Sequence, residues 1–284
     1  MTHIRKEIEY LSSDGVRLAI HKWVPATVKG IVFYIHGLQS HGGWLWEAGN
    51  LFAASGMAFV CIDRRGSGLS EGPRGEFPPL DQLLIDYTRA IAHCRAALQA
   101  SVPVNLFGHC LGGSILAALL NQKDFTTPFD SVVFCSAWLG KLHATLGEAV
   151  MASIRNDESD AAWDAGLRAD DFASEQHYVR FINEDELATR TLTCRSRKNV
   201  LELEQRYLSM SWQCKKPTVY ISGYQDSVVD LTSALQVFRK LTNGHGASIQ
   251  LPTDKHYLFF TEVRYSLVEW VSLLTLHRGI LHRA

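Results

Sequence analysis

One short stretch, Gly108-His109-Cys110-Leu111-Gly112-Gly113, constrains the fold of this chain more than any other feature. The apolar run 102–107 before it is typical of a buried strand, and the Ala- and Leu-rich run 114–120 after it is typical of a buried helix. A nucleophile between glycines at such a junction predicts a tight, strained turn at the carboxyl edge of a sheet. We therefore expect Cys110 to be the nucleophile, with its side chain exposed at the turn.

The segments on either side of this turn alternate between strand-like and helix-like patterns. Two alternating segments, 6–11 and 16–24, are joined by Ser12-Ser13-Asp14-Gly15, which predicts a β-hairpin. Further strands are expected at 30–35, 57–62, 131–135, 217–222 and 248–251, and helices at 45–55, 81–99, 231–241 and 258–276. Strands that alternate with helices imply an α/β fold with a mostly parallel sheet covered on both faces.

The alternation is interrupted between residues 137 and 216. This segment has no strong strand pattern, many charges and scattered aromatic residues. We interpret it as a helical cap inserted into a core made of residues 1–136 and 217–284. Because it starts and ends at the carboxyl edge of the sheet, we expect the cap to roof Cys110, with charged residues such as Asp157, Glu158 and Arg195 to Lys198 facing solvent.

Composition narrows the class of protein and the kind of partner. A chain of 284 residues can form one large α/β domain with an insertion, and its formal charge of −1 gives no reason to expect nucleic acid or an anionic membrane as partner. No signal-like segment opens the chain and no apolar run is long enough to cross a bilayer, so we expect a cytoplasmic protein without an integral membrane segment. The six cysteines have neither paired metal spacing nor a disulfide framework, so no metal and no cofactor are expected.

A nucleophile at this turn needs a general base and a carboxylate that orients the base. The residues of such a triad follow along the chain in the order nucleophile, acid, histidine. Asp226 comes just after the expected strand 217–222, and His256 lies in the loop between the last strand and the last helix. Asp230 directly precedes a helical run and is better explained as its N-cap. The sequence thus predicts a catalytic triad of Cys110, Asp226 and His256.

Two backbone N–H groups are needed to stabilise the negative oxygen that forms when a carbonyl group is attacked. The first predicted donor is the N–H of Leu111, directly after the nucleophile. The second is the N–H of Leu38, in the Gly-rich loop that follows the strand 30–35. We expect His41 in the same loop either to form a hydrogen bond within the loop or to contact substrate.

Aromatic side chains of the cap are candidates for an acyl-binding surface. Each of them is also explained by packing within a small core of the cap itself. The substrate contacts predicted from the sequence are His41, Trp138, Trp163, Tyr178 and Trp212. They predict a pocket for a medium or large, mainly apolar acyl group of a small-molecule substrate.

Taken in order, these motifs resemble those of the α/β-hydrolase superfamily, in particular its branch of monoacylglycerol lipases and lysophospholipases. The matching stretches are His36-Gly37 with His41-Gly42-Gly43, Asp63 to Gly72, Gly108 to Gly113, Gly223 to Asp226, and His256 through Glu262. The resemblance covers nearly the whole chain except the cap, and it implies the α/β-hydrolase fold and the catalytic positions rather than a particular substrate. We interpret Asp63 and Arg64-Arg65 as residues that tie a loop together.

The departure from that branch is Cys110, because the branch has serine at this position. Cysteine occurs there in dienelactone hydrolases, bile-acid-type acyltransferases and polyhydroxyalkanoate synthases. An engineered substitution of cysteine for serine would also give this sequence. A thiol beside histidine ionises readily, and its thioester reacts well with amines and thiols as well as with water. We therefore expect an enzyme that cleaves an ester or thioester through an acyl-Cys110 intermediate. Acyl transfer or cyclisation with an amine or alcohol acceptor is the first alternative, and a binding protein on an inactive hydrolase scaffold is the second.

Overall fold

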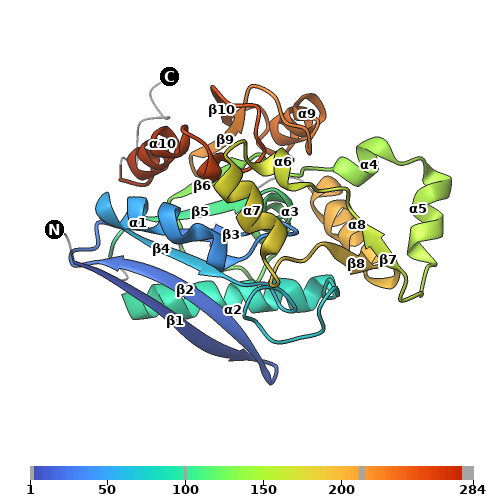
Figure 1. Ribbon diagram of the computed structural model, residues 1–284, viewed down its shortest axis with the longest axis horizontal. Helices are drawn as coiled ribbons and strands as arrows, with labels where there is room; N and C mark the ends of the chain where they lie inside the picture. The colour runs from blue at the N-terminus through green and yellow to red at the C-terminus, as the bar shows by residue number, and fades with distance from the viewer. Residues whose placement is uncertain (1–2, 99–100, 211–214, 277–284) are drawn as a thin grey trace.

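An eight-stranded sheet forms the centre of the protein (Figure 1). The computed structural model describes residues 3–98, 101–210 and 215–276. Across the sheet the strands follow the order β1 (Ile4–Ser13), β2 (Val16–Pro25), β4 (Met57–Ile62), β3 (Gly30–Ile35), β5 (Val104–His109), β6 (Ser131–Cys135), β9 (Thr218–Gly223) and β10 (Ala247–Leu251). The β1–β2 and β2–β4 pairs are antiparallel and all the other pairs in this sheet are parallel, so the predicted mostly parallel sheet is confirmed.

The hairpin predicted at the start of the chain is present, and its turn is shorter than the four-residue link 12–15 expected from the sequence. Asp14 and Gly15 have positive φ angles of 54° and 77°, and Ser13 pairs with Val16 across the turn. A turn with two left-handed residues matches the right-handed twist of the flanking strands, and Asp-Gly is a favoured pair for it. The hairpin therefore adds an antiparallel edge to an otherwise parallel sheet.

Helices cover both faces of the sheet, as expected. The first face packs against α1 (Trp46–Ala54) and α10 (Arg264–Leu276), and the opposite face packs against α2 (Leu80–Leu98), α3 (Leu111–Leu120) and α9 (Leu231–Leu241). Every residue of β3, β4, β5, β6 and β9 is buried, because a parallel strand between two helical layers has no solvent face. Within the described ranges, none of the helices combines the length and the apolar character needed to cross a membrane.

The last helix starts later than the sequence pattern predicts. Leu258–Phe260 forms a short 3-10 turn, and α10 begins only at Arg264. All three side chains of the turn are buried, so they point to different parts of the core instead of sharing one helix face. The apolar residues on both sides of Thr261 and Glu262 hide this change of direction, which is why the expected helix 258–276 was too long.

The cap, residues 137–216, lies between β6 and β9. Its elements are α4 (Lys141–Thr145), α5 (Glu148–Arg155), β7 (Ala162–Asp164), α6 (Ala169–Phe172), α7 (Gln176–Glu184), β8 (Thr191–Thr193) and α8 (Cys194–Leu208). The cap is mainly helical, as expected, and it also contains two short strands, β7 and β8, that pair antiparallel. Strands of three residues are too short to produce a recognisable alternation of polar and apolar residues.

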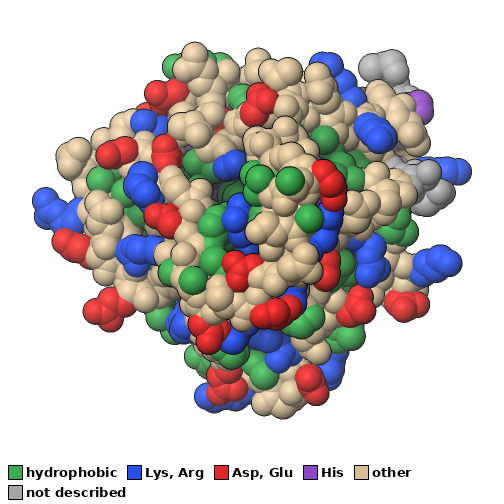
Figure 2. Space-filling view, turned by 90° about the vertical axis from the view of Figure 1, so that its right-hand side faces the viewer, with side chains coloured by type: hydrophobic (Ala, Val, Ile, Leu, Met, Phe, Trp, Pro, Cys, Tyr) green, Lys and Arg blue, Asp and Glu red, His purple; other side chains and the backbone are tan. Residues whose placement is uncertain are grey.

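The outer end of the cap faces solvent with charges of both signs. Figure 1 shows α4, α5, α8 and the β7–β8 pair at the right-hand end of the molecule, and Figure 2 shows acidic and basic side chains mixed over that side. Glu158 and Arg195 are exposed, as predicted, whereas Asp157, Arg197 and Lys198 are half-buried. Arg195 forms an ion pair with Glu76 of the core at 2.6 Å. This face gives no field of one sign that would attract a highly charged partner.

Candidate active site

Cys110 occupies a strained turn between β5 and α3. Its φ and ψ angles are 53° and −126°, a combination that side chains rarely adopt. The flanking glycines are required by space, because a Cβ atom on Gly108 would lie 2.6 Å from the Gly112 carbonyl oxygen, and one on Gly112 would lie 2.1 Å from the Ile35 carbonyl oxygen. The close packing of these segments is what allows the turn to hold Cys110 at the sheet edge.

The Cys110 side chain is buried, and the expectation of an exposed thiol was wrong. Only 1% of Cys110 is accessible to solvent. Two neighbouring segments close over it: a Cβ atom on Gly37 would lie 2.9 Å from Cys110 Cβ, and Trp138 N–H donates to the Cys110 carbonyl oxygen at 2.9 Å. The candidate site is therefore closed in this conformation.

His256 and Asp226 lie together as the sequence order predicts. His256 Nδ1–H donates to Asp226 Oδ2 at 2.8 Å, and both side chains are at most 1% exposed. Asp226 Oδ1 also accepts the N–H groups of Val228 and Val229 at 2.8 and 2.9 Å. Burial alone would raise the pKa of Asp226, but His256 and these N–H groups hold it below its ordinary value. Asp230 instead accepts the N–H at the start of α9, so its predicted role as N-cap is confirmed.

The electrostatics of the site favour a thiolate–imidazolium pair. Burial by itself raises the pKa of the Cys110 thiol, but His256 and the backbone N–H groups of Leu111 and Leu38 outweigh it, so the pKa is lowered. Burial likewise opposes a charge on His256, yet Asp226 and Cys110 raise the pKa of the imidazole well above its usual range. His256 Nε2 is buried and has no nitrogen or oxygen partner among the described residues, which leaves it to the Cys110 sulfur.

The loop 36–44, which we call the oxyanion loop, is held from the core by a buried arginine. Arg64 is 2% exposed, and its two terminal nitrogens donate to the carbonyl oxygens of Gly37 and Leu38 at 3.0 Å each. The Arg64 N–H donates to His36 Nε2, so His36 carries its proton on Nδ1 and donates it to the Gly37 carbonyl oxygen. The interpretation of Arg64 as a residue that ties a loop together is confirmed. The tied loop is the one that carries the Leu38 N–H.

Sequence reasoning missed the part of the cap that touches His256. Phe172 of α6 packs edge-on against the His256 ring with centroids 5.6 Å apart. The backbone N–H of His256 donates to the Asp171 carbonyl oxygen at 2.8 Å. No motif marks either residue, because α6 is a single helical turn in a polar stretch. The cap thus contributes to the walls of the candidate site at the histidine.

Two of the aromatic residues predicted to contact substrate are buried against protein. Trp138 is 1% exposed, and its Nε1–H donates to Glu204 at 2.6 Å. Tyr178 is also 1% exposed, stacks on Phe260 with centroids 4.4 Å apart and donates its hydroxyl to Glu47 at 2.6 Å. These contacts agree with the packing explanation, and substrate contact by either residue stays a prediction.

The other predicted substrate contacts have different surroundings. Trp163 is half-buried under the guanidinium of Arg197, whose central carbon lies 4.5 Å from the ring centroid. Trp212 lies outside the described residues. His41 accepts the Gly43 N–H at Nδ1, which confirms the expected hydrogen bond within the oxyanion loop.

The mostly parallel sheet with helices on both faces and the strained turn at Cys110 are those of the α/β-hydrolase fold. The chain belongs to the family described as "Serine aminopeptidase, S33", whose profile matches residues 26–262. The monoglyceride lipase of Rattus norvegicus is 28% identical over 130 residues, which are 44% of this chain and 41% of that lipase. An uncharacterized abhydrolase domain-containing protein of Dictyostelium discoideum is 37% identical over 117 residues, 40% of this chain and 12% of that protein.

Solved structures share this fold at low sequence identity. A soluble variant of monoglyceride lipase from Saccharomyces cerevisiae, in complex with a substrate analog, has a TM-score of 0.77 at 17% identity, covering 96% of this chain and 97% of that chain. The curated relatives are longer proteins, and the chain spans less than half the length of each one that it matches.

Proposed function

We propose that the protein cleaves an ester or thioester of a mainly apolar acyl group through an acyl-Cys110 intermediate. The observation that carries the proposal is the buried set of three side chains, in which Asp226 holds His256 Nδ1 and leaves Nε2 to the Cys110 sulfur. The Leu38 and Leu111 N–H groups, which already help to lower the pKa of Cys110, are the proposed oxyanion donors.

Acylation in this mechanism starts from the thiolate. Cys110 Sγ attacks the substrate carbonyl carbon and forms a C–S bond, while the carbonyl electron pair moves onto the oxygen and is stabilised by the Leu38 and Leu111 N–H groups. When the tetrahedral intermediate collapses, the bond to the leaving alcohol or thiol breaks. The His256 imidazolium gives its Nε2 proton to that leaving group, and the acyl group stays on Cys110 as a thioester.

Deacylation repeats these steps with a new nucleophile. Neutral His256 takes a proton from water as the water attacks the thioester, and the carboxylic acid leaves as the Cys110 thiolate and the imidazolium are restored. An amine or alcohol at the same place would take the acyl group instead. The cysteine at position 110 favours this second candidate, acyl transfer, because a thioester reacts well with amines.

The proposed substrate follows from the position of the cap. Residues 137–216 enter and leave at the carboxyl edge of the sheet, where sheets of this kind bind ligands, and Phe172 lines the site beside His256. The rat and yeast relatives named monoglyceride lipase are in keeping with an apolar acyl group. Each added methylene that enters the pocket should improve binding by about 0.8 kcal/mol until the pocket is full.

The experiment combines a substrate panel with mass spectrometry of the intact protein. The panel holds p-nitrophenyl esters of increasing chain length, an acyl thioester and, because of the family description, an amino-acid p-nitroanilide. An acyl adduct that is lost in Cys110→Ala and kept in Cys194→Ala, a half-buried cysteine of the cap, supports the proposal.

Each result of that panel has a distinct meaning. No adduct and no turnover on any substrate would favour an inactive binding scaffold. Rates that decline steadily from acetate onward would contradict the apolar pocket. An added amine that diverts the product would assign acyl transfer.

A further inference from the structure

We propose that Asp185 of the cap is a positioning residue that holds the oxyanion loop in place for acylation of Cys110. This inference rests on the proposed function and assigns part of the oxyanion geometry to the cap. Asp185 comes directly after α7, and the loop that it contacts follows β3. The two segments are 144 residues apart in the chain when measured from His41 to Asp185.

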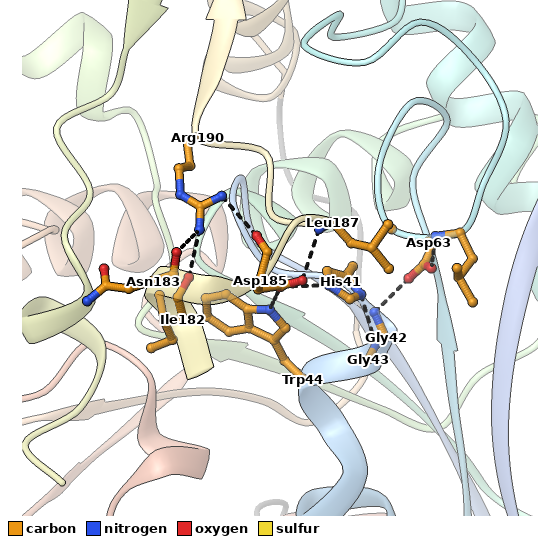
Figure 3. Close-up of polar contacts among 12 residues, drawn as sticks. His41, Gly42, Gly43, Trp44, Asp63, Ile182, Asn183, Asp185, Leu187 and Arg190 are labelled. Carbon is orange, nitrogen blue, oxygen red and sulfur yellow. Dashed lines mark hydrogen bonds and ion pairs between the residues drawn. The ribbon is translucent and has the colours of Figure 1, made fainter. Parts of the chain in front are cut away.

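One carboxylate oxygen of Asp185 binds two side chains of the loop (Figure 3). Asp185 Oδ2 accepts His41 Nε2–H at 2.9 Å and Trp44 Nε1–H at 2.6 Å. The His41 and Asp185 side chains are 4% and 8% exposed, so water competes little for these bonds. Asp185 Oδ1 accepts the Leu187 N–H at 3.0 Å, which fixes the rotation of the carboxylate.

The proton position on His41 follows from its second bond. The Gly43 N–H donates to His41 Nδ1 at 3.0 Å, and a backbone amide cannot accept. Nδ1 is therefore unprotonated, and the ring proton lies on Nε2, where it points at Asp185. His41 forms a hydrogen bond at each ring nitrogen, one to Asp185 and one to the Gly43 N–H. A movement of Asp185 would therefore move the backbone of the loop.

Asp185 is itself held by a turn that its neighbours close. Arg190 donates to the carbonyl oxygen of Asp185 at 2.9 Å and to those of Ile182 and Asn183 at 2.8 Å each, so it caps the last turn of α7 (Figure 3). The same segment makes a backbone contact with the loop, since Thr189 N–H donates to the Gln39 carbonyl oxygen at 3.1 Å. The cap thus contacts the loop at Gln39 as well as at His41 and Trp44.

The core contacts the same loop at other positions. Arg64 binds the carbonyl oxygens of Gly37 and Leu38. Asp63 Oδ1 accepts the Gly42 N–H at 2.6 Å, as Figure 3 shows. The Leu38 N–H, the proposed oxyanion donor, therefore belongs to a loop held by both core and cap. We expect the donor to drift when the cap contacts are removed, because the remaining bonds restrain only part of the loop.

Trp44, the second side chain that Asp185 binds, contacts residues next to His256. Its ring packs edge-on against Tyr257 and Phe172 with centroid distances of 5.5 and 5.6 Å. Tyr257 follows His256 in the chain, and Phe172 contacts the His256 ring. The Asp185 carboxylate thus binds two residues of the oxyanion loop, and one of them, Trp44, packs against the two residues that lie next to His256.

The test compares two reactions of the same thiol in the full-length protein. Acylation by a p-nitrophenyl ester forms an oxyanion and therefore needs the oxyanion donors. In alkylation by iodoacetamide the thiolate attacks a saturated carbon, so no oxyanion forms. In Asp185→Ala we expect acylation to fall about 10- to 100-fold. Because the Leu38 N–H also lowers the pKa of Cys110, alkylation is measured at a pH where the thiol is fully ionised in both proteins, and there it should stay within about twofold of wild type. Asp185→Asn can keep its carbonyl oxygen toward His41 and Trp44 only by turning its NH2 group toward the Leu187 N–H, which then loses its acceptor, so it should restore part of the acylation rate.

A control variant and a second variant separate positioning from other roles. Asp164→Ala removes an exposed cap carboxylate paired with Arg168, and it should leave both rates unchanged. His41→Phe keeps a ring but removes both hydrogen bonds, so it should show the same selective loss of acylation even if Asp185→Ala does not fold.

The outcomes discriminate between this proposal and the function on which it rests. Equal losses of acylation and alkylation in the Asp185 and His41 variants would assign a merely structural role, and a rise in both rates would assign a gate; either result overturns the proposal. If the wild type is acylated and Asp185→Ala is acylated equally fast, this proposal alone is overturned. A wild type that is never acylated overturns the proposed function and this proposal with it.

Discussion

Replacing Asp226 with asparagine tests whether this carboxylate orients His256. His256 Nδ1–H donates to Asp226 Oδ2, and Oδ1 accepts the N–H groups of Val228 and Val229. Asparagine can accept from both backbone donors only with its carbonyl oxygen, so its NH2 group must face Nδ1. His256 must then accept at Nδ1 and carry its proton on Nε2, where it can no longer take a proton from a nucleophile.

The magnitude follows from the charge that is lost beside the imidazolium. Two unit charges about 4 Å apart attract each other by about 4 kcal/mol at an effective dielectric constant of about 20. Because about 1.4 kcal/mol corresponds to a factor of ten, kcat/KM for an activated ester should fall by about 10²- to 10³-fold. In a serine protease the same change costs about 10⁴-fold. The smaller loss is expected here because a thiol that is already ionised depends less on the base.

The assay is the rate of Cys110 alkylation by iodoacetamide as a function of pH. In the wild type the pKa of Cys110 is lowered, so alkylation stays fast below the ordinary thiol pKa of about 8.5 and slows only when the pair takes up a proton at lower pH. In Asp226→Asn the imidazolium is less stable, so the pKa of Cys110 rises and alkylation already slows near pH ~8.5. An unchanged pH profile would refute the reasoning.

A nearby aspartate provides the matched control for this substitution. Asp230 caps α9 and accepts the Thr232 N–H at 3.0 Å, so it shares the loop with Asp226 but not the contact with His256. Asparagine is about as good an N-cap as aspartate. Asp230→Asn should therefore keep the alkylation profile and kcat/KM of the wild type. If Asp230→Asn instead proves to be the damaging change, the acid of the triad is misassigned.

The remaining predictions concern the nucleophile and two buried charged residues. Cys110→Ser should hydrolyse activated esters with less transfer to an added amine, which the ratio of products measures; an unchanged ratio would contradict the role of the thioester. Arg64→Lys can keep only one of the two bonds to the oxyanion loop, so we expect about a tenfold loss of acylation rate and about 2 kcal/mol of unfolding free energy, measured by ester kinetics and urea titration. Glu204 is fully buried: its Oε1 accepts Trp138 Nε1–H and Leu142 N–H, and its Oε2 accepts the His143 N–H. Glutamine has only one acceptor oxygen, so Glu204→Gln should lower the unfolding free energy by about 2 kcal/mol because at least one N–H loses its acceptor; a loss below about 0.5 kcal/mol would contradict this.

The sheet could be predicted from the sequence because buried parallel strands leave a strong local signal. Runs such as 30–35 and 57–62 are apolar throughout, and their ends match β3 and β4. The turn at Cys110 is equally local, since its glycines and its flanking runs are contiguous. The contact between Asp226 and His256 could be predicted for the same reason, because each residue follows a strand whose end the pattern marks.

The closure of the site could not be predicted, because it depends on contacts between segments far apart in the chain. The burial of Cys110 results from packing against the oxyanion loop and the segment that begins the cap. Asp185 lies in a polar stretch with no periodicity, and nothing in that stretch points to His41. Local patterns define the strands and turns that carry the candidate site, whereas tertiary packing defines whether it is open.

The closed site gives the cap a chemical role in the proposed mechanism. Cys110 and His256 are 1% and 0% exposed, so part of the protein around them must move before water, substrate or an acceptor can reach the sulfur. The acyl thioester would be shielded in the same way, and its lifetime would depend on what the cap admits rather than only on its intrinsic reactivity. Because Phe172 packs on His256 and Asp185 holds the oxyanion loop, the cap residues that control access also contact the catalytic groups. Cap substitutions should therefore change the partition between hydrolysis and transfer as well as the affinity for substrate.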